Sequence, residues 1–342
     1  MKLKLKSCLV LLAVAGVLQT AQADTFYWNN ASGGYWDDPA SWTSGSGTGT
    51  YPGDASVTGS QYDNIGANKV NLPFTITLRK DERAYNYQAG DLKGTGSQTI
   101  DLGGHHLKLA YLQYTGCVID PVAHNVIPVR RMEFRNGSFE VPNFIIGSWS
   151  TGTGGSIVFS DCTFTGRLEQ AAVKSSIFVR EGSTWVYPKG NVTDINIPFD
   201  YNSRTDWPGA CLCITGANSR VEAPNNDLYV KHVRSGVYLF EGTSASFKDI
   251  IIGSTAASVD NVVDIRGAAL EVSGDICLGT DNETSRGSKV LVSGAAAKVS
   301  GASLTAYDGE ACALGLTIPA SGFDKVGETD VARISIVREL FS

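Results

Sequence analysis

Paired carboxylates are the first residues of this chain that could do chemistry. Hydrolysis of a glycosidic bond needs two carboxyl groups that face each other across a cleft at roughly 5–10 Å. Two pairs have a suitable spacing in the sequence, Asp194 with Asp200 and Asp260 with Asp264. Acidic side chains are mostly exposed, and both pairs also suit a solvated turn or strand edge. We therefore favour a surface role over a catalytic one for both pairs.

Arginines and histidines offer a second kind of chemistry. A polysaccharide lyase needs a base beside a metal or an arginine that stabilises the acid group of its substrate. Arg130, Arg131 and Arg135 form a local basic cluster, and His105 is followed directly by His106. Adjacent residues of a strand point to opposite faces, so neither Arg130 and Arg131 nor the two histidines converge. The pattern favours a solvated strand edge over an active site or a metal pair.

Motifs for metals and cofactors are weak in this sequence. Asp281-Asn282-Glu283 supplies oxygen atoms of the kind that bind calcium, but the other positions of a calcium loop do not follow. Cys211 and Cys213 have no companion pair, and only four histidines are present, so the ligand spacing of a zinc site is missing. The sequence also has no nucleophile elbow, phosphate loop or dinucleotide fingerprint. We expect no catalytic residue, no metal and no cofactor.

Aromatic residues near the N-terminus suggest binding instead of catalysis. The candidate ligand-binding residues are Trp28, Tyr35, Trp36 and Trp42. Flat rings can stack on the faces of sugars, and exposed aromatic surfaces often mark binding sites. In the competing interpretation the three tryptophans cover the end of a stack of strands, where open edges would otherwise join another molecule. We favour the covering role.

A repeat of short strands must position these residues. Glycines recur at spacings of 26, 25 and 27 residues, at Gly216, Gly242, Gly267 and Gly294. The residues two and four positions before them are apolar: Ile214, Phe240, Ile265 and Val292, and Leu212, Tyr238, Val263 and Val290. Five positions after them stand Val221, Phe247, Val272 and Val299. A third apolar patch follows in each unit. Alternation with a period of two predicts about three strands per unit.

The repeat predicts the fold class. A unit of about 25 residues with three short strands cannot bury its apolar face alone, but stacking on its neighbours at about 4.8 Å completes the core. We predict an all-β chain with a right-handed parallel β-helix, or β-solenoid, over residues 71–342, most regular at 212–304. A tryptophan-rich β cap precedes it at 24–70. β-Sandwich domains are the alternative, although they do not explain a pattern that recurs every 25 to 27 residues.

Residues 1–23 have the features of a secretory signal peptide. Three lysines precede an apolar run from Cys8 to Leu18, and Ala21-Gln22-Ala23 provides a cleavage pattern of small residues. The run is shorter than the roughly 20 apolar residues that a membrane span requires. We predict a mature chain that begins at Asp24, has no transmembrane span and is secreted or held at the cell surface.

The net charge limits the kinds of partner that this chain can bind, and the cysteine content limits the disulfides that it can form. Without the three lysines of the signal, 25 basic residues remain against 34 acidic ones, a net charge of −9. Such a charge disfavours nucleic acid and anionic membranes. The six cysteines of the mature chain are Cys117, Cys162, Cys211, Cys213, Cys277 and Cys312. We favour buried apolar thiols, with one or more disulfides as the alternative that export permits.

Parts of the sequence resemble a known group of proteins. Trp28 and the stretch 34–42 (GYWDDPASW), followed by Tyr51-Pro52-Gly53-Asp54, resemble the opening of large exported bacterial proteins with autotransporter-like β-strand repeats. Residues 267–279 and 293–301 resemble the glycine-punctuated rungs of such passengers. The resemblance implies a parallel β-helix in a surface or secreted protein, often an adhesin-like one. Only 38 residues follow Leu304, fewer than a membrane barrel of eight strands needs, so we expect a passenger-type domain without its own barrel.

Together these features favour an exported structural or adhesive β-solenoid module without its own catalytic site. Its partners would be extracellular glycans or other surface proteins. The alternative is a carbohydrate-active protein on the same scaffold, either a polysaccharide lyase or hydrolase or a carbohydrate-binding protein. The sequence does not decide whether the chain is an enzyme.

Overall fold

The structure is a computed structural model. It describes residues 23–45, 50–66, 70–89, 94–115, 127–147, 154–172, 174–188, 194–197, 209–253, 258–279, 287–306, 309–314, 325–328 and 332–337. Apart from Ala23, the predicted signal peptide lies outside these residues.

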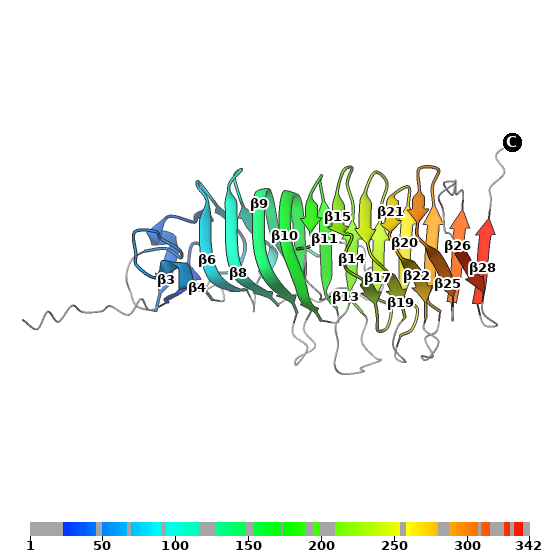
Figure 1. The fold of residues 1–342 in the computed structure, drawn as a ribbon. Coiled ribbons are helices and arrows are strands. Elements are labelled where there is room, and N and C mark those ends of the chain that lie inside the picture. Colours follow the sequence, from blue (N-terminus) through cyan, green and yellow to red (C-terminus); the bar gives the residue numbers. More distant parts are fainter. Residues whose placement is uncertain are drawn as a thin grey trace, which may run out of the picture.

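Strands make up most of the described chain and lie side by side along one long axis (Figure 1). Nearly all of them pair in parallel, which confirms the predicted all-β fold with large parallel sheets. A β-sandwich would instead consist of antiparallel sheets. Two turns of 3-10 helix occur in the described residues, η1 (Pro39–Ser41) and η2 (Ser60–Tyr62). No helix in this part of the chain is long and apolar enough to cross a membrane.

The strands form three series, within each of which neighbours are joined by parallel ladders. The first series consists of β2 (Gly34–Tyr35), β5 (Leu72–Thr77), β7 (Gly94–Asp101), the first halves of β9 (Arg131–Ile146) and β10 (Ser156–Ala171), β11 (Ser176–Arg180), β14 (Cys211–Ile214), β17 (Gly236–Leu239), β20 (Val262–Arg266), β23 (Lys289–Ser293), β26 (Gly309–Leu314) and β28 (Ala332–Val337).

The second series runs beside the first and shares two long strands with it. It consists of β1 (Thr25–Trp28), β4 (Asn64–Ile65), β6 (Glu82–Ala89), β8 (His106–Tyr114), the second halves of β9 and β10, β12 (Thr184–Val186), β15 (Arg220–Ala223), β18 (Ser244–Phe247), β21 (Ala269–Val272) and β24 (Lys298–Ser300). One antiparallel strand, β3 (Trp42–Ser44), pairs with β1 at the N-terminal end.

The third series begins later in the chain, in a separate sheet. Its members are β13 (Ile195–Ile197), β16 (Leu228–Val230), β19 (Ile250–Ile252), β22 (Asp275–Leu278), β25 (Ser303–Ala306) and β27 (Lys325–Glu328). From β13 onward each unit therefore contains up to three short strands, as the repeat predicts.

Inward residues of each unit stack on their counterparts in the next unit. In the first series the stacked residues are Leu212, Val237, Val263 and Val290. In the third series they are Leu228, Ile250, Ile276 and Leu304. All of them are buried in one continuous hydrophobic core that extends through the stack.

The glycine alignment is wrong at one unit. It places Tyr238 and Phe240 on the inner side of their strand, but β17 directs Val237 and Leu239 inward. Tyr238 and Phe240 instead pack on the outer face, in a small second cluster with Cys213. In this unit one more residue separates the strand from its turn glycine than in the preceding unit. A slip of one residue exchanges the two faces of a strand, because its side chains alternate.

The recurring glycines have a backbone role. Gly216, Gly242, Gly267 and Gly294 each follow a strand of the first series and precede one of the second, with φ values of +81°, +75°, +65° and +91°. Residues with a Cβ atom rarely adopt this left-handed region, whereas glycine enters it without steric cost. The turn that joins the two series therefore explains why glycine recurs in every unit.

Replacing one of these glycines tests this role. We expect Gly242→Ala to cost about 1–2 kcal/mol, because alanine must adopt a left-handed conformation. Gly242→Asn should lose less, because asparagine tolerates this region better. Urea unfolding followed by circular dichroism measures the effect, with Glu241→Ala in the same turn as the control. An alanine variant as stable as the parent would contradict the proposed backbone role.

Candidate functional site

The three tryptophans of the candidate ligand-binding set are buried in the structure. Trp28 and Trp36 have no exposed surface, and Trp42 is 6% exposed. Trp42 contacts both of the others edge to face, with ring centroids 4.9 Å from Trp28 and 5.4 Å from Trp36. Trp28 also stacks on Phe74 of β5 at 6.2 Å, so the cluster lies directly against the core of the first strands. These rings offer no open face on which a sugar could stack.

Each indole of this cluster has a hydrogen-bond acceptor for its N–H group. Trp28 Nε1 donates to the backbone carbonyl of Asn30 at 2.7 Å, and Trp36 Nε1 donates to that of Pro52 at 3.0 Å. Trp42 Nε1 donates to the carbonyl of Trp36 at 2.7 Å. A buried indole needs such an acceptor, since an unpaired N–H costs free energy. The cluster is therefore well suited to fixed packing.

Two aromatic surfaces remain exposed near this end of the molecule. Tyr35 is 46% exposed, but the guanidinium of Arg79 lies over its ring at 4.1 Å. Tyr62 and Tyr85 form an edge-to-face pair with centroids 6.2 Å apart, and both are about half exposed. Sequence reasoning missed this pair because Tyr62 lies outside the tryptophan-rich motif and meets Tyr85 only in the folded chain. Sugar stacking therefore stays a prediction for Tyr35.

Glu82, the first residue of β6, is a buried acidic residue. Its side chain is 3% exposed, and the nearest cation, Lys80 Nζ, lies 3.9 Å from Oε1. Lys80 donates a hydrogen bond to the hydroxyl of Tyr51 instead, at 2.8 Å. Burial raises the pKa of Glu82 from 4.5 to about 7, and the opposing attraction of Lys80 is too weak to cancel this effect.

Two of the carboxylates considered for hydrolysis, Asp194 and Asp264, have separate local partners. Asp264 is buried and forms an ion pair with Arg266, with 2.6 Å between Oδ2 and Nη2. Asp260 lies in the turn before β20 with a φ of +55°. Asp194 precedes β13, and its carboxylate accepts a hydrogen bond from a backbone N–H of the next unit at 3.3 Å. Asp200 lies outside the described residues.

Two of the three arginines considered for lyase chemistry, Arg131 and Arg135, are also paired locally. Arg131 binds Glu133 at 2.8 Å, and the same carboxylate accepts a hydrogen bond from the hydroxyl of Ser160. Arg135 binds Asp101 on the neighbouring strand at 2.9 Å. These carboxylates occupy the guanidinium groups that a lyase would need for its substrate.

The two histidines have different neighbours, and only His106 belongs to a strand, β8. His106 Nδ1 lies 2.8 Å from the hydroxyl of Ser138, whereas His105 Nδ1 lies 3.8 Å from Asp81. Within the described residues, no three His, Cys, Asp or Glu side chains are grouped so that they could hold a metal ion. The possible calcium ligands at 281–283 lie outside the described residues.

The cysteines whose side chains the structure describes are free thiols. Cys162, Cys211 and Cys213 are buried, which confirms the preferred interpretation for these three, and Cys277 is partly buried. Burial raises the pKa of Cys162 and of Cys213 to about 12. At neutral pH these thiols are therefore protonated and poorly nucleophilic. Cys117 and the side chain of Cys312 are outside the described part of the structure.

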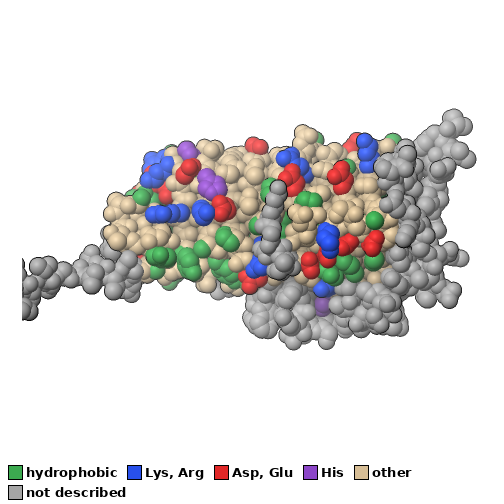
Figure 2. Space-filling view, viewed as in Figure 1, with side chains coloured by type: hydrophobic (Ala, Val, Ile, Leu, Met, Phe, Trp, Pro, Cys, Tyr) green, Lys and Arg blue, Asp and Glu red, His purple; other side chains and the backbone are tan. Residues whose placement is uncertain are grey.

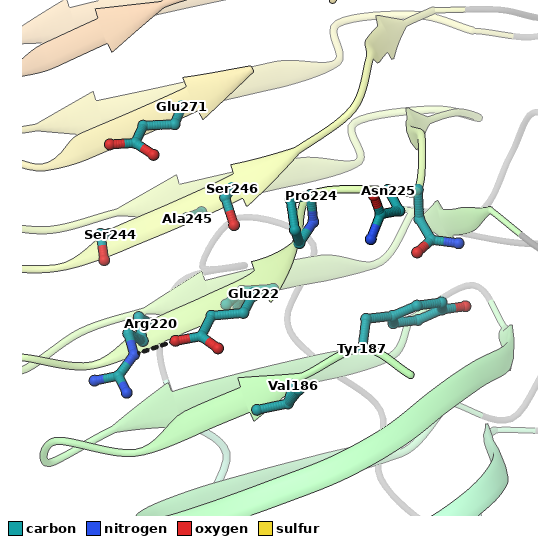
Figure 3. Close-up of a pocket in the computed structure, with 12 residues that line it drawn as sticks. Val186, Tyr187, Arg220, Glu222, Pro224, Asn225, Ser244, Ala245, Ser246 and Glu271 are labelled. Atoms are coloured by element: carbon teal, nitrogen blue, oxygen red, sulfur yellow. Dashed lines mark hydrogen bonds and ion pairs between the residues drawn. The ribbon is translucent and has the colours of Figure 1, made fainter. Parts of the chain in front are cut away.

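A groove of about 500 Å³ lies on the outer face of the second series, between β12 and β21 (Figure 3). Parallel register aligns its outward residues in two rows across these strands. One row contains Val186, Glu222, Ser246 and Glu271, and the other contains Arg220 and Ser244. The short side chain of Ser246 lies between the longer side chains of Glu222 and Glu271, and Arg220 is followed in its row by the short side chains of Ser244 and Ala269. This difference in side-chain length hollows the face at that point.

The charged groups of the groove come from two strands. Arg220 Nε donates to Glu222 Oε1 at 2.6 Å, and this pair is nearly half exposed. Glu271 extends from β21 on the other side of Ser246 (Figure 3). Two strand spacings separate Glu222 from Glu271, which places their Cα atoms about 9.5 Å apart. Pro224, Asn225 and the buried Tyr187 close one end of the groove.

Sequence reasoning missed the groove because the turns differ in length. Glu222 stands six residues after Gly216, whereas Ser246 and Glu271 stand four residues after Gly242 and Gly267. An alignment on the glycines does not place these side chains in one row. The pairing of the strands does place them in one row, so the groove can be recognised only from the pairing register.

Acidic and basic side chains are interspersed over the face shown in the space-filling view (Figure 2). Comparison of the chain with protein-family models, with curated proteins and with solved structures found no match. The described residues define an all-β chain of stacked, mainly parallel strands, with a groove of mixed polar and apolar lining on its outer face.

The buried carboxylate makes stability depend on pH. The folded-state pKa of Glu82 is raised, so its protonated form favours folding below about pH 4.5, and this stability declines as the pH rises to about 7. Glu82→Gln removes the ionisable group. We expect the variant to melt a few degrees higher than the parent at pH 8, since a shift of this size corresponds to roughly 3 kcal/mol.

Thermal melts between pH 4.5 and 8 measure this effect. At pH 4.5 the difference between Glu82→Gln and the parent should nearly disappear, because both side chains are then largely uncharged. Glu241→Gln, on an exposed side chain, is the control and should leave the pH dependence as it is. A constant difference across the whole range would argue against titration of Glu82.

Proposed function

We propose that this chain is an exported right-handed parallel β-helix that acts as a structural or adhesive module, at the cell surface or outside the cell. The observation that carries the proposal is the parallel ladder of the first series. It runs from β5 through β9, β10, β14 and β23 to β28 without a break between the described strands. Such a stack is a stiff rod with a long lateral surface, which suits a spacer or an adhesin.

The handedness of the proposed helix follows from a general rule. Each chain segment that leaves a strand of the first series returns to the same sheet in parallel, one strand further along. Parallel crossovers of this kind are right-handed in about 98% of known cases. A parallel β-helix is built entirely from such crossovers.

The charged side chains support a role other than catalysis. The carboxylates and arginines with the most suitable spacing are held by neighbouring residues, as in the pairs Asp264 with Arg266 and Glu133 with Arg131. The signal-like N-terminus and the resemblance to autotransporter-like passengers point to the outside of the cell. The acidic net charge agrees with a partner other than nucleic acid.

A carbohydrate-active enzyme on the same scaffold is the second candidate. The observation that favours it is that Glu222 and Glu271, with Cα atoms about 9.5 Å apart, line one groove, since a glycosidase needs two carboxyl groups on either side of a cleft. Against this candidate, Arg220 Nε donates to Glu222 Oε1 at 2.6 Å, so this carboxylate already has a local partner. Release of reducing sugars from polysaccharides by the purified chain would establish this second candidate.

Export and shape test the leading proposal together. We expect a bacterial host to export the full chain and to cleave it before Asp24, which mass spectrometry of the exported protein detects. Small-angle scattering should show a rod, since the twelve described strands of the first series span roughly 50 Å at about 4.8 Å per step. An uncleaved chain retained in the cytoplasm, or the scattering curve of a compact sphere, would refute the proposal.

A further inference from the structure

The groove over β12, β15, β18 and β21 offers both donors and acceptors of hydrogen bonds. The carboxylates of Glu222 and Glu271 accept, whereas the guanidinium of Arg220 donates (Figure 3). The hydroxyls of Ser244 and Ser246 do both, and each of these serines is partly exposed on the groove floor. A ligand that matches this set must carry many groups that donate and accept at short intervals. Sugar hydroxyls have this property.

The charge of the groove limits the ligand further. The charge of Arg220 is balanced by Glu222 at 2.6 Å, which leaves the carboxylate of Glu271 without a balancing cation among the lining residues. The net negative charge disfavours phosphates, sulfates and uronic acids. One exposed carboxylate is also a weak anchor for a cationic peptide, because exposed ion pairs contribute only about 0–1 kcal/mol. An uncharged ligand fits best.

Apolar atoms at one end of the groove complete the match. Val186 lies on the floor beside Glu222, and Pro224 is exposed at the turn that follows β15. The C–H faces of a sugar ring can pack on such aliphatic surfaces while its hydroxyls reach the polar row. The volume of about 500 Å³ lies within the roughly 300–1,000 Å³ of ordinary ligand sites.

We infer that this groove is the glycan-binding site of the adhesive module, and that its ligand is an uncharged oligosaccharide or polysaccharide. The inference rests on the proposed function and names the chemical class of the partner. Glu222 and Glu271 accept hydrogen bonds from hydroxyls on the two sides of the serine row. Arg220 holds Glu222 in place and donates to the ring or hydroxyl oxygens.

A blocked groove tests the inference. Purified mature chain is applied to immobilised neutral oligosaccharides, with uronate-containing oligosaccharides and an oligolysine peptide for comparison. Ser246→Arg fills the groove with a long side chain, and we expect it to lower the affinity for neutral glycans at least about tenfold. Glu271→Ala should lower it about tenfold, the effect of losing one hydrogen bond to a charged acceptor. Ser273→Arg is the matched control and should bind as the parent does, because Ser273 is exposed in a turn that does not line the groove.

Three results would overturn the inference. They are the absence of any neutral glycan binding by the parent chain, binding that Ser246→Arg leaves intact, and a preference for the peptide or the uronates. Circular dichroism and small-angle scattering of each variant separate loss of the site from loss of the fold. Any of these results would leave the evidence on export and rod shape unchanged. A chain that is neither exported nor elongated would instead refute the proposed function, whatever ligand it binds.

Discussion

Parallel hydrogen bonding between strands of successive units is the constraint on which this structure depends. Each backbone ladder holds neighbouring strands about 4.8 Å apart, so a side chain lies directly above its counterpart in the previous unit. Inside the stack this favours apolar residues in vertical rows, such as Leu228 on Ile250 and Ile250 on Ile276. A polar residue in such a row needs a partner inside the core, as Gln98 has between Phe74 and Met132, where its amide donates to the hydroxyl of Tyr87.

The same constraint makes like side chains neighbours on the outer surface. Asp227, Asp249 and Asp275 occupy equivalent positions just before or at the start of third-series strands, so their negative charges would repel. Hydrogen bonds and the positive charge of one lysine offset this repulsion. Lys248 Nζ bridges the carboxylates of Asp227 and Asp249 at 3.0 and 2.9 Å. The N–H of Asp275 donates to Asp249 Oδ1 at 2.7 Å.

The N-terminal end of the stack needs a different solution, because a first parallel strand has an open edge. Here β3 pairs with β1 in the antiparallel sense, and the indoles of Trp28, Trp36 and Trp42 pack together beside Phe74. Because the N–H group of each indole donates a hydrogen bond, the three rings are held in fixed positions. Glu82 and Asp63 are both buried in the same region, and burial raises the pKa of each, so the protonation of these carboxyl groups affects how firmly the N-terminal segment is held.

The sequence by itself determined the all-β class, the unit of about 25 residues and the need for glycine at the turns. These features follow from local chemistry: alternation with a period of two, and a left-handed backbone at positions such as Gly216. Only the tertiary structure decided which face Tyr238 and Phe240 occupy, because one extra residue before a turn exchanges the two faces of a strand. It also decided that Glu222, Ser246 and Glu271 share a groove. Residues about 25 positions apart become neighbours through the register of parallel pairing, which turns of unequal length hide from the sequence.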